Sequence, residues 1–245
     1  MNYDYNKKIN VNYTYTDANL NLSLIGSVAL IQEFMTEFFD KIGSTNIKLQ
    51  KENDALWVVS KTKVKFFKIP VWNEDIDTKG YIIKHRSIRI ETENAYRYIN
   101  GDLAFVVNQE LCVIDINSRK LRSIDSDIFP DDIELKESVV NTGYLKLNDD
   151  FSEDDFYYEQ EAFLPDIDNS KHVNNIAYIR YILNTLSSDF YDKIKLKDFE
   201  IHYINEAKEK QKLKIYKKQF DDEIRFLIKE SDREIIRASL RYEML

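Results

Sequence analysis

The loop before the helix-like segment at Asn174 gathers side chains suited to moving protons. It belongs to the stretch PDIDNSKHVNNIAYIRYIL, which contains His172, one of only three histidines in the chain. An imidazole, with an ordinary pKa of about 6.5, transfers protons readily near neutral pH. The surrounding polar residues are Asp166, Asp168, Asn169, Ser170, Asn174 and Asn175. The pattern predicts a site for acid–base chemistry, with His172 as a mere brace of the helix start as the alternative.

The helix that follows this loop supplies a second chemical resource. Its apolar face is formed by Ile176, Ile179, Leu183 and Leu186. The first turn of a helix has free backbone N–H groups and the positive end of a dipole. Such donors stabilise the oxyanion that forms when a carbonyl is attacked.

The first half of the chain contains elements of both kinds. Apolar residues at three-to-four spacing predict an amphipathic helix from Leu24 to Gly43, with Ser23 as its cap and Gly43 as its end. The alternation in Val11–Asp17 predicts a strand before it. Runs rich in β-branched and aromatic residues predict further strands over 56–69, 80–92, 95–100 and 103–116.

The second half repeats this order. A strand is predicted over 155–163, a helix from Asn174 or Asn175 to Leu186, and strands over 199–207, 212–220, 223–230 and 234–244. This order predicts an α+β fold in which each half is an antiparallel sheet wrapped around one long helix. We expect domains at 1–135 and 145–245, with the acidic stretch Asp125–Gly143 as linker. One larger α+β domain is the alternative.

The composition excludes several classes of protein. A hydrophobic content of 43% excludes wholesale disorder, and no window has the roughly 18 apolar residues of a membrane span. A net charge of −8 argues against a nucleic-acid binder, and five glycines form no phosphate loop. The single cysteine, Cys112, excludes an internal disulfide and a cysteine-based zinc site. Because the N-terminus has no apolar signal core, we expect a cytoplasmic protein.

The sequence of the loop and helix resembles that of a known family. The pattern Asp-x-Asp, His-Val-Asn-Asn and Tyr, met from Asp166 to Tyr178, is similar to the signature of the acyl-acyl carrier protein thioesterases. The runs LWVVSKTKVKFFKIPVWNEDI and FEIHYINEAKEKQKLKI look like two further landmarks of that family. The resemblance implies a double hot-dog fold and hydrolysis of fatty acyl thioesters, without metal or organic cofactor. It also implies that the first domain holds the acyl chain, and a bacterial member is the nearer comparison.

The resemblance assigns roles to particular residues. It places the catalytic glutamate at Glu206, which activates water or attacks directly; we favour water. His172 would transfer protons, and Asp168 would orient its ring. Ser170 stands where the family has asparagine and is expected to position the reactants, with the adjacent Asn169 as the alternative. Ala207 replaces the cysteine of plant members, so Cys112, expected in the core, has no catalytic role.

Other residues are given supporting or structural roles. Asn174 and Asn175 are expected at the cap on the substrate-binding side, and Phe34 and Phe38 at the acyl cavity. Asp166 is expected to be a solvated acid or a favourable charge near the helix start. His202, four residues before Glu206, would share its strand face, or be an ordinary half-exposed histidine. The remaining histidine, in IIKHRSIRI, is expected to be structural.

The expected partner is acidic acyl carrier protein. Although the chain is acidic overall, the segment Lys193–Lys218 contains nine lysines and four acids, a positive patch that would steer such a partner. A solvated strand edge is the alternative. An acyl-coenzyme A thioesterase and a non-catalytic acyl-binding or sensing protein remain rival functions. We expect no nucleic-acid or membrane partner, and a homodimer is left open.

Overall fold

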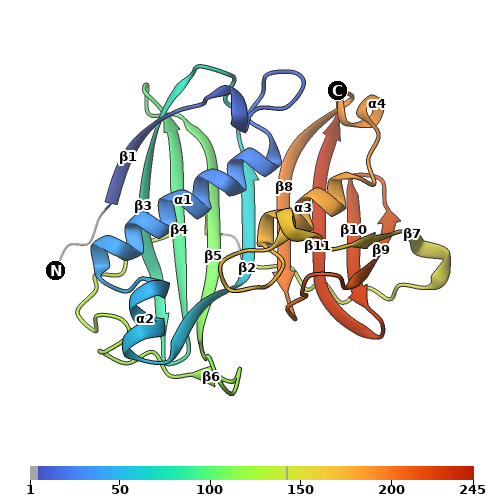
Figure 1. The fold of residues 1–245 in the computed structure, drawn as a ribbon. Coiled ribbons are helices and arrows are strands. Elements are labelled where there is room, and N and C mark those ends of the chain that lie inside the picture. Colours follow the sequence, from blue (N-terminus) through green and yellow to red (C-terminus); the bar gives the residue numbers. More distant parts are fainter. Residues whose placement is uncertain (1–4, 142) are drawn as a thin grey trace. The chain divides into compact units, whose positions relative to one another are not determined.

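The computed structural model describes residues 5–141 and 143–245, and the chain divides between residues 142 and 143 into two compact units. Each unit is an antiparallel sheet with a helix lying across one face (Figure 1). This confirms the predicted α+β class. None of the helices within the described residues is long and apolar enough to cross a membrane.

The first unit contains strands in the order β1-β3-β4-β5-β2, and β6 also pairs with β5. Its elements are β1 (Tyr5–Asn10), η1 (Tyr13–Tyr15), α1 (Leu24–Ile42), α2 (Asn46–Glu52), β2 (Ala55–Phe66), β3 (Asp75–Arg86), β4 (Arg89–Tyr98), β5 (Leu103–Asp115) and β6 (Leu121–Arg122).

Helix α1 begins and ends where the sequence predicts. The Ser23 side chain accepts a hydrogen bond from the Gly26 N–H, and Gly43 adopts the left-handed φ of 79° that glycine tolerates best. The apolar face packs into the core, where Phe34 and Phe38 are 0% and 1% exposed.

Two predictions for the first half are wrong, and one helix was not predicted. Val11–Asp17 is a loop with a short 3₁₀ turn, because the Asn12 side chain accepts the Thr14 N–H and closes the chain into a turn. The run over 80–92 is not one strand: it spans the end of β3 and the start of β4, joined through residues 87 and 88. Helix α2, capped by the Thr45 side chain, was not expected.

The stretch predicted as a linker contributes to the first core. Phe129 is fully buried, and its ring lies 6.0 Å from that of Phe39 and 5.8 Å from that of Trp57. Farther along, the Ser138 hydroxyl and the Val139 N–H both donate to the buried carboxylate of Glu93. Residues 129–139 therefore pack as part of this unit.

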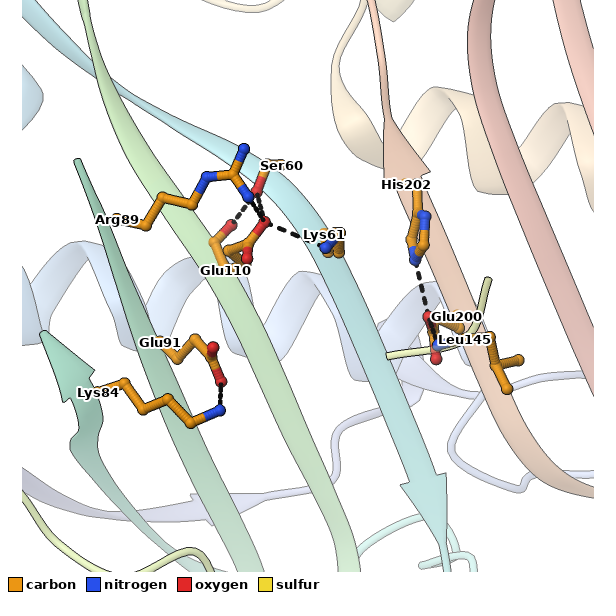
Figure 2. A network of polar contacts seen from close by, with 9 residues as sticks. All are labelled: Ser60, Lys61, Lys84, Arg89, Glu91, Glu110, Leu145, Glu200 and His202. Carbon is orange, nitrogen blue, oxygen red and sulfur yellow. Dashed lines mark hydrogen bonds and ion pairs between the residues drawn. The ribbon is translucent and has the colours of Figure 1, made fainter. Parts of the chain in front are cut away.

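Charged side chains also cluster on the first sheet. Glu110 accepts a hydrogen bond of 2.8 Å from the Ser60 hydroxyl and lies 3.3 Å from both Lys61 Nζ and Arg89 Nη1 (Figure 2). Burial raises the pKa of the Glu110 carboxyl, but the Ser60 hydroxyl and the two cations outweigh burial and hold that pKa below its ordinary value. The buried Cys112 thiol, on the same strand, has a pKa raised by burial, as expected for an inert core cysteine.

The second unit contains strands in the order β8-β11-β10-β9-β7. Its elements are η2 (Glu153–Asp155), β7 (Phe156–Glu161), η3 (Leu164–Asp166), α3 (Asn175–Leu183), α4 (Ser188–Tyr191), β8 (Ile194–Tyr203), β9 (Lys212–Gln219), β10 (Glu223–Glu230) and β11 (Arg233–Met244).

Helix α3 is shorter than predicted. It ends at Leu183, with Asn184 as its C-cap. The chain then turns, and the Thr185 hydroxyl donates to the Ile182 carbonyl. The prediction that Glu206 lies on a strand is wrong. Strand β8 ends at Tyr203, and Glu206 lies in the loop that follows it.

Candidate active site

The loop from Asp168 to Val173 closes on itself and fixes the backbone of His172. The Asp168 N–H donates to the His172 carbonyl at 2.9 Å, and the Lys171 N–H donates to the Asp168 carbonyl at 3.1 Å. Lys171 has a φ of 67°, the left-handed conformation that allows so tight a return. An isolated bridge between Ile167 and Val173 then aligns the two ends of the loop.

The Asp168, Ser170 and His172 side chains form a chain of hydrogen bonds. The Ser170 hydroxyl lies 2.6 Å from Asp168 Oδ1 and 3.2 Å from His172 Nδ1. A carboxylate only accepts, so the hydroxyl donates to Asp168 and accepts from the Nδ1–H of the ring. Asp168 thus orients the imidazole through Ser170. The other ring nitrogen, Nε2, faces away from these hydrogen bonds.

Glu206 lies opposite that nitrogen. His172 Nε2 is 3.5 Å from Glu206 Oε2, and the two side chains are 15% and 40% exposed. Histidine and glutamate therefore meet at a point that remains open to solvent. The spacing lies at the outer limit of a direct hydrogen bond and suits a water molecule that contacts both groups.

The backbone of Ala207 brings the Glu206 loop to the start of α3. The Ala207 carbonyl accepts the Val173 N–H at 2.8 Å, and its N–H donates to the Tyr178 hydroxyl at 3.2 Å. Tyr178 is buried, and burial raises the pKa of its phenol, so it stays neutral and holds this bond. This positioning role was not predicted, although Tyr178 belongs to the signature pattern.

The asparagines at the helix start have different positions. Asn174 is the N-cap of α3, and its side chain accepts the Ile176 N–H at 2.9 Å. Asn175 is the first helical residue. Asn169 is exposed, so Ser170 rather than Asn169 contacts the imidazole.

Of the two roles predicted for Asp166, that of a solvated acid is wrong. It is 5% exposed, forms an ion pair with Arg180, and accepts the Phe163 N–H at 2.9 Å. Its backbone carbonyl also accepts the Asn174 N–H at 2.7 Å. Asp166 therefore anchors the loop to α3 from inside.

Replacing Arg180 by alanine is expected to lower the free energy of unfolding by about 1–3 kcal/mol, because the Asp166 carboxylate stays buried without its cation. Urea denaturation measures this loss. The matched control is Arg241→Ala, whose guanidinium lies 3.8 Å from Asp198 and is similarly exposed. That change is expected to cost less than about 0.5 kcal/mol. Equal losses in both variants would contradict the anchoring role of Asp166.

The other two histidines lie elsewhere. Figure 2 shows His202 turned toward Glu200 on its own strand, with Nε2 2.7 Å from Glu200 Oε1. The same carboxylate oxygen accepts the Leu145 N–H at 2.7 Å. The predicted shared face of His202 and Glu206 is wrong, because the strand ends between them. His85 packs edge-on against Phe129 at 5.6 Å in the first unit.

The aromatic residues expected at the acyl cavity lie in the first unit. Phe34 and Phe38 are buried under α1, with ring centroids 6.3 Å apart. Phe34 also lines a hollow of about 190 Å³ between α1 and β1. The other residues of this hollow are Lys7, Lys8, Ile9, Asn10, Asn12, Tyr15, Leu30 and Glu33.

Several lysines of the predicted basic patch are paired with acids outside it. Lys197 pairs with Glu243, Lys212 lies 3.5 Å from Glu159, and Lys218 lies 3.4 Å from Asp155. These pairs reduce the local excess of positive charge. Exposed lysines beside the site are Lys171, Lys208 and Lys210.

The comparisons with known proteins cover both units. Residues 2–131 match the acyl-ACP thioesterase N-terminal domain, and residues 152–243 match the acyl-ACP thioesterase C-terminal domain. A chloroplastic dodecanoyl-acyl-carrier-protein hydrolase of Cinnamomum camphora is 23% identical over 174 residues, or 66% of this chain. That match covers 44% of the plant protein, so the chain spans about half the length of such relatives.

Solved structures share the fold. An acyl-ACP thioesterase from Bacteroides thetaiotaomicron superposes with a TM-score of 0.88 at 16% identity, covering 98% of both chains. The 12:0-ACP thioesterase of Umbellularia californica gives 0.85 at 15% identity, covering 99% of this chain and 98% of that one. These likenesses confirm the predicted fold class.

Proposed function

We propose that this chain, which belongs to the acyl-ACP thioesterase family, hydrolyses fatty acyl thioesters of acyl carrier protein to a free fatty acid and the carrier thiol. The observation that carries the proposal is the meeting of His172 and Glu206, 3.5 Å apart, beside the start of α3. An acid–base pair, a solvent-accessible position and a helix N-terminus are the parts that thioester hydrolysis needs.

In the proposed reaction Glu206 takes a proton from a water molecule that also contacts His172. The water oxygen bonds to the acyl carbon, and the carbonyl oxygen becomes an oxyanion. Glu206 passes this proton to Nε2 of His172, which becomes an imidazolium. The tetrahedral intermediate then collapses, the C–S bond breaks, and the departing sulfur receives the same proton from the imidazolium, so both residues return to their starting state. The products are the carboxylic acid and the thiol, so no external oxidant or reductant is required.

The start of α3 supplies a donor for the oxyanion. The Ile176 N–H is engaged by the Asn174 side chain, and the Ala177 N–H donates to the Asn174 carbonyl at 2.9 Å. We assign the oxyanion to the Asn175 N–H, which lies at the positive end of the helix dipole. In this assignment Asn174 acts as the cap that holds the first turn in place.

The two units would divide the work. The second unit contains all the residues assigned to the reaction, and the first would hold the acyl chain in its core beneath α1. The burial of Phe34 and Phe38 there supports this division, because an apolar chain needs apolar walls.

Acyl carrier protein is the proposed carrier because exposed lysines flank the reactive pair. Lys171 is adjacent to His172, and Lys208 and Lys210 follow Glu206 in the same loop. Cations within a Debye length of about 8 Å attract an acidic partner and raise its association rate.

The double substitution Lys208→Glu and Lys210→Glu is expected to lower kcat/KM for acyl carrier protein about tenfold at low salt. High salt should shrink this difference, and turnover of a short thioester model should be unchanged. The control is Lys51→Glu with Lys120→Glu, which makes the same charge change on exposed lysines of the first unit. Loss of activity on both substrates would show that the lysines do not act by steering.

The experiment that tests the carrier compares the same acyl chain on acyl carrier protein and on coenzyme A, with thiol release as the readout. A higher kcat/KM on the carrier protein supports the proposal. A preference for coenzyme A would reassign the chain as an acyl-coenzyme A thioesterase. Tight binding of the acyl chain without thiol release would favour the acyl-binding or sensing alternative.

A further inference from the structure

The helix-facing side of the first sheet is polar where a core is usually apolar. Thr92, Asn94 and Tyr96 alternate along β4 and therefore point to one face. On β3, Gly80 pairs with Asn94 and Thr78 pairs with Tyr96, so the two strands present one continuous polar surface. The four side chains of this surface are at most 2% exposed. We call Thr78, Thr92, Asn94 and Tyr96 the buried polar patch.

Gly80 shows that this patch faces α1. A Cβ placed on Gly80 would lie 2.3 Å from Phe34 Cε1 and 2.6 Å from Asn94 Nδ2. The missing side chain therefore lets the Phe34 ring of α1 and the Asn94 amide approach each other over β3. Glu93, which precedes Asn94, points to the opposite face and accepts the Tyr81 hydroxyl at 2.7 Å.

The patch has hydrogen-bonding capacity that the described part of the chain does not use. Within residues 5–141 and 143–245, the Thr92 hydroxyl and both amide atoms of Asn94 have no hydrogen-bond partner, and the Thr78 and Tyr96 hydroxyls have none beyond each other. Buried polar groups are normally paired, since leaving them unpaired is costly. On the same face Gln109, which pairs with Thr92 in the ladder, donates to the Thr62 hydroxyl at 3.1 Å. The unused capacity is thus concentrated under Phe34.

A route to the patch passes Phe34. The Phe34 ring lines the hollow of about 190 Å³, and the same ring and the Asn94 amide both lie within 2.6 Å of the position that a Cβ on Gly80 would take. Phe34 is thus a wall shared by the hollow and the patch. A change in the rotamer of this one side chain would open the Asn94 amide to the hollow.

We propose that the buried polar patch binds an oxygen-bearing acyl chain, a hydroxy- or oxo-acyl group, and makes the first unit selective for it. This inference rests on the proposed function. The Asn94 amide can donate and accept, and the three hydroxyls can do either, so together they satisfy both a hydroxyl and a carbonyl. An unsubstituted alkyl chain would leave the Thr92 hydroxyl and the Asn94 amide unpaired, and a site with unpaired buried polar groups discriminates strongly against a ligand that cannot pair them.

The test compares acyl carrier protein loaded with a saturated chain and with its monohydroxy and mono-oxo counterparts of the same length, with the oxygen at successive positions. For at least one position, the wild-type kcat/KM should exceed that for the saturated chain by about tenfold or more. The preference should disappear in Thr78→Val and in Asn94→Leu. It should persist in Thr62→Val, which removes a hydroxyl of the same face that already has a partner.

Two results would overturn the proposal. Equal or lower kcat/KM for every oxygenated chain would mean that the patch holds ordered water only. A preference that survives both Thr78→Val and Asn94→Leu would place the selectivity elsewhere. Thermal unfolding separates these outcomes from misfolding: Asn94→Leu should not lower Tm, because it removes an unpaired buried amide, and Thr78→Val should still unfold in a single cooperative transition.

Failure of the proposed function would look different, because no acyl thioester would release thiol. The patch is then tested by binding, as the rise in Tm that free saturated and hydroxy fatty acids produce. A larger rise with the hydroxy acid, lost in Asn94→Leu, supports the patch. Equal rises overturn it.

Discussion

His172→Ala is expected to lower kcat for acyl thioester hydrolysis by about 10²–10⁴-fold, the usual contribution of a positioned general acid and base. The imidazole is held by Ser170 on one side and faces Glu206 on the other, and alanine can neither relay the proton nor protonate the leaving sulfur. The fold should persist, because the loop is closed by the backbone groups of residue 172. Steady-state thiol release gives kcat, and circular dichroism checks the fold.

The matched control is His85→Ala, a histidine that packs against Phe129 in the first unit. It should change kcat by less than a factor of about two, since nothing in the proposed reaction uses it. If the His172→Ala enzyme retains a rate within a few-fold of wild type, the imidazole is not the proton carrier.

Glu206→Gln is expected to lower kcat by a similar factor of about 10²–10⁴. The amide preserves size and shape but cannot take a proton from water. KM should change little, because in the proposed reaction the carboxylate acts on water rather than on the substrate. Glu209→Gln, an exposed glutamate of the same loop, is the control and should leave kcat unchanged.

A single turnover in heavy-oxygen water distinguishes the two roles considered for Glu206. If the carboxylate activates water, the label enters the fatty acid and Glu206 stays unlabelled. If the carboxylate attacks the acyl carbon directly, an anhydride forms, and its hydrolysis can leave label in the Glu206 side chain. Mass spectrometry of the peptide that contains Glu206 reads the result. Label there would contradict water activation.

The parts of the molecule that depend on local signals could be predicted from the sequence. Ser23 and Gly43 define the ends of α1 through their own side chain and backbone conformation. Asp168, Ser170 and His172 lie within five residues, so any tight loop brings them together. These interactions need no knowledge of distant strands.

The remaining features depend on contacts between distant segments. Glu206 reaches His172 because the Ala207 backbone bonds to Val173 and Tyr178, and hydrophobic periodicity does not reveal such bonds. The burial of Asp166 likewise depends on its ion pair with Arg180, which lies 14 residues later in the chain, on α3.

Strand propensity also gave wrong predictions at two places where the chain forms a short turn. The β3–β4 turn has no glycine, asparagine or proline at residues 87 and 88, so an unbroken strand was expected. The alternation in Val11–Asp17 likewise resembled a strand, but the Asn12 side chain closes a turn there. A side-chain hydrogen bond of the turn at Asn12 and the antiparallel pairing of β3 with β4 across residues 87 and 88 prevail over strand propensity in these two places.

The most direct test of the account is a parallel measurement of thiol and fatty acid released from acyl carrier protein by the wild-type chain and by the variant carrying both His172→Ala and Glu206→Gln. We expect equal amounts of the two products from wild type. We also expect the double variant to be about as slow as the slower of the two single variants and not slower still, because the two residues act on one water. A double variant that hydrolyses the substrate at the wild-type rate would contradict the account.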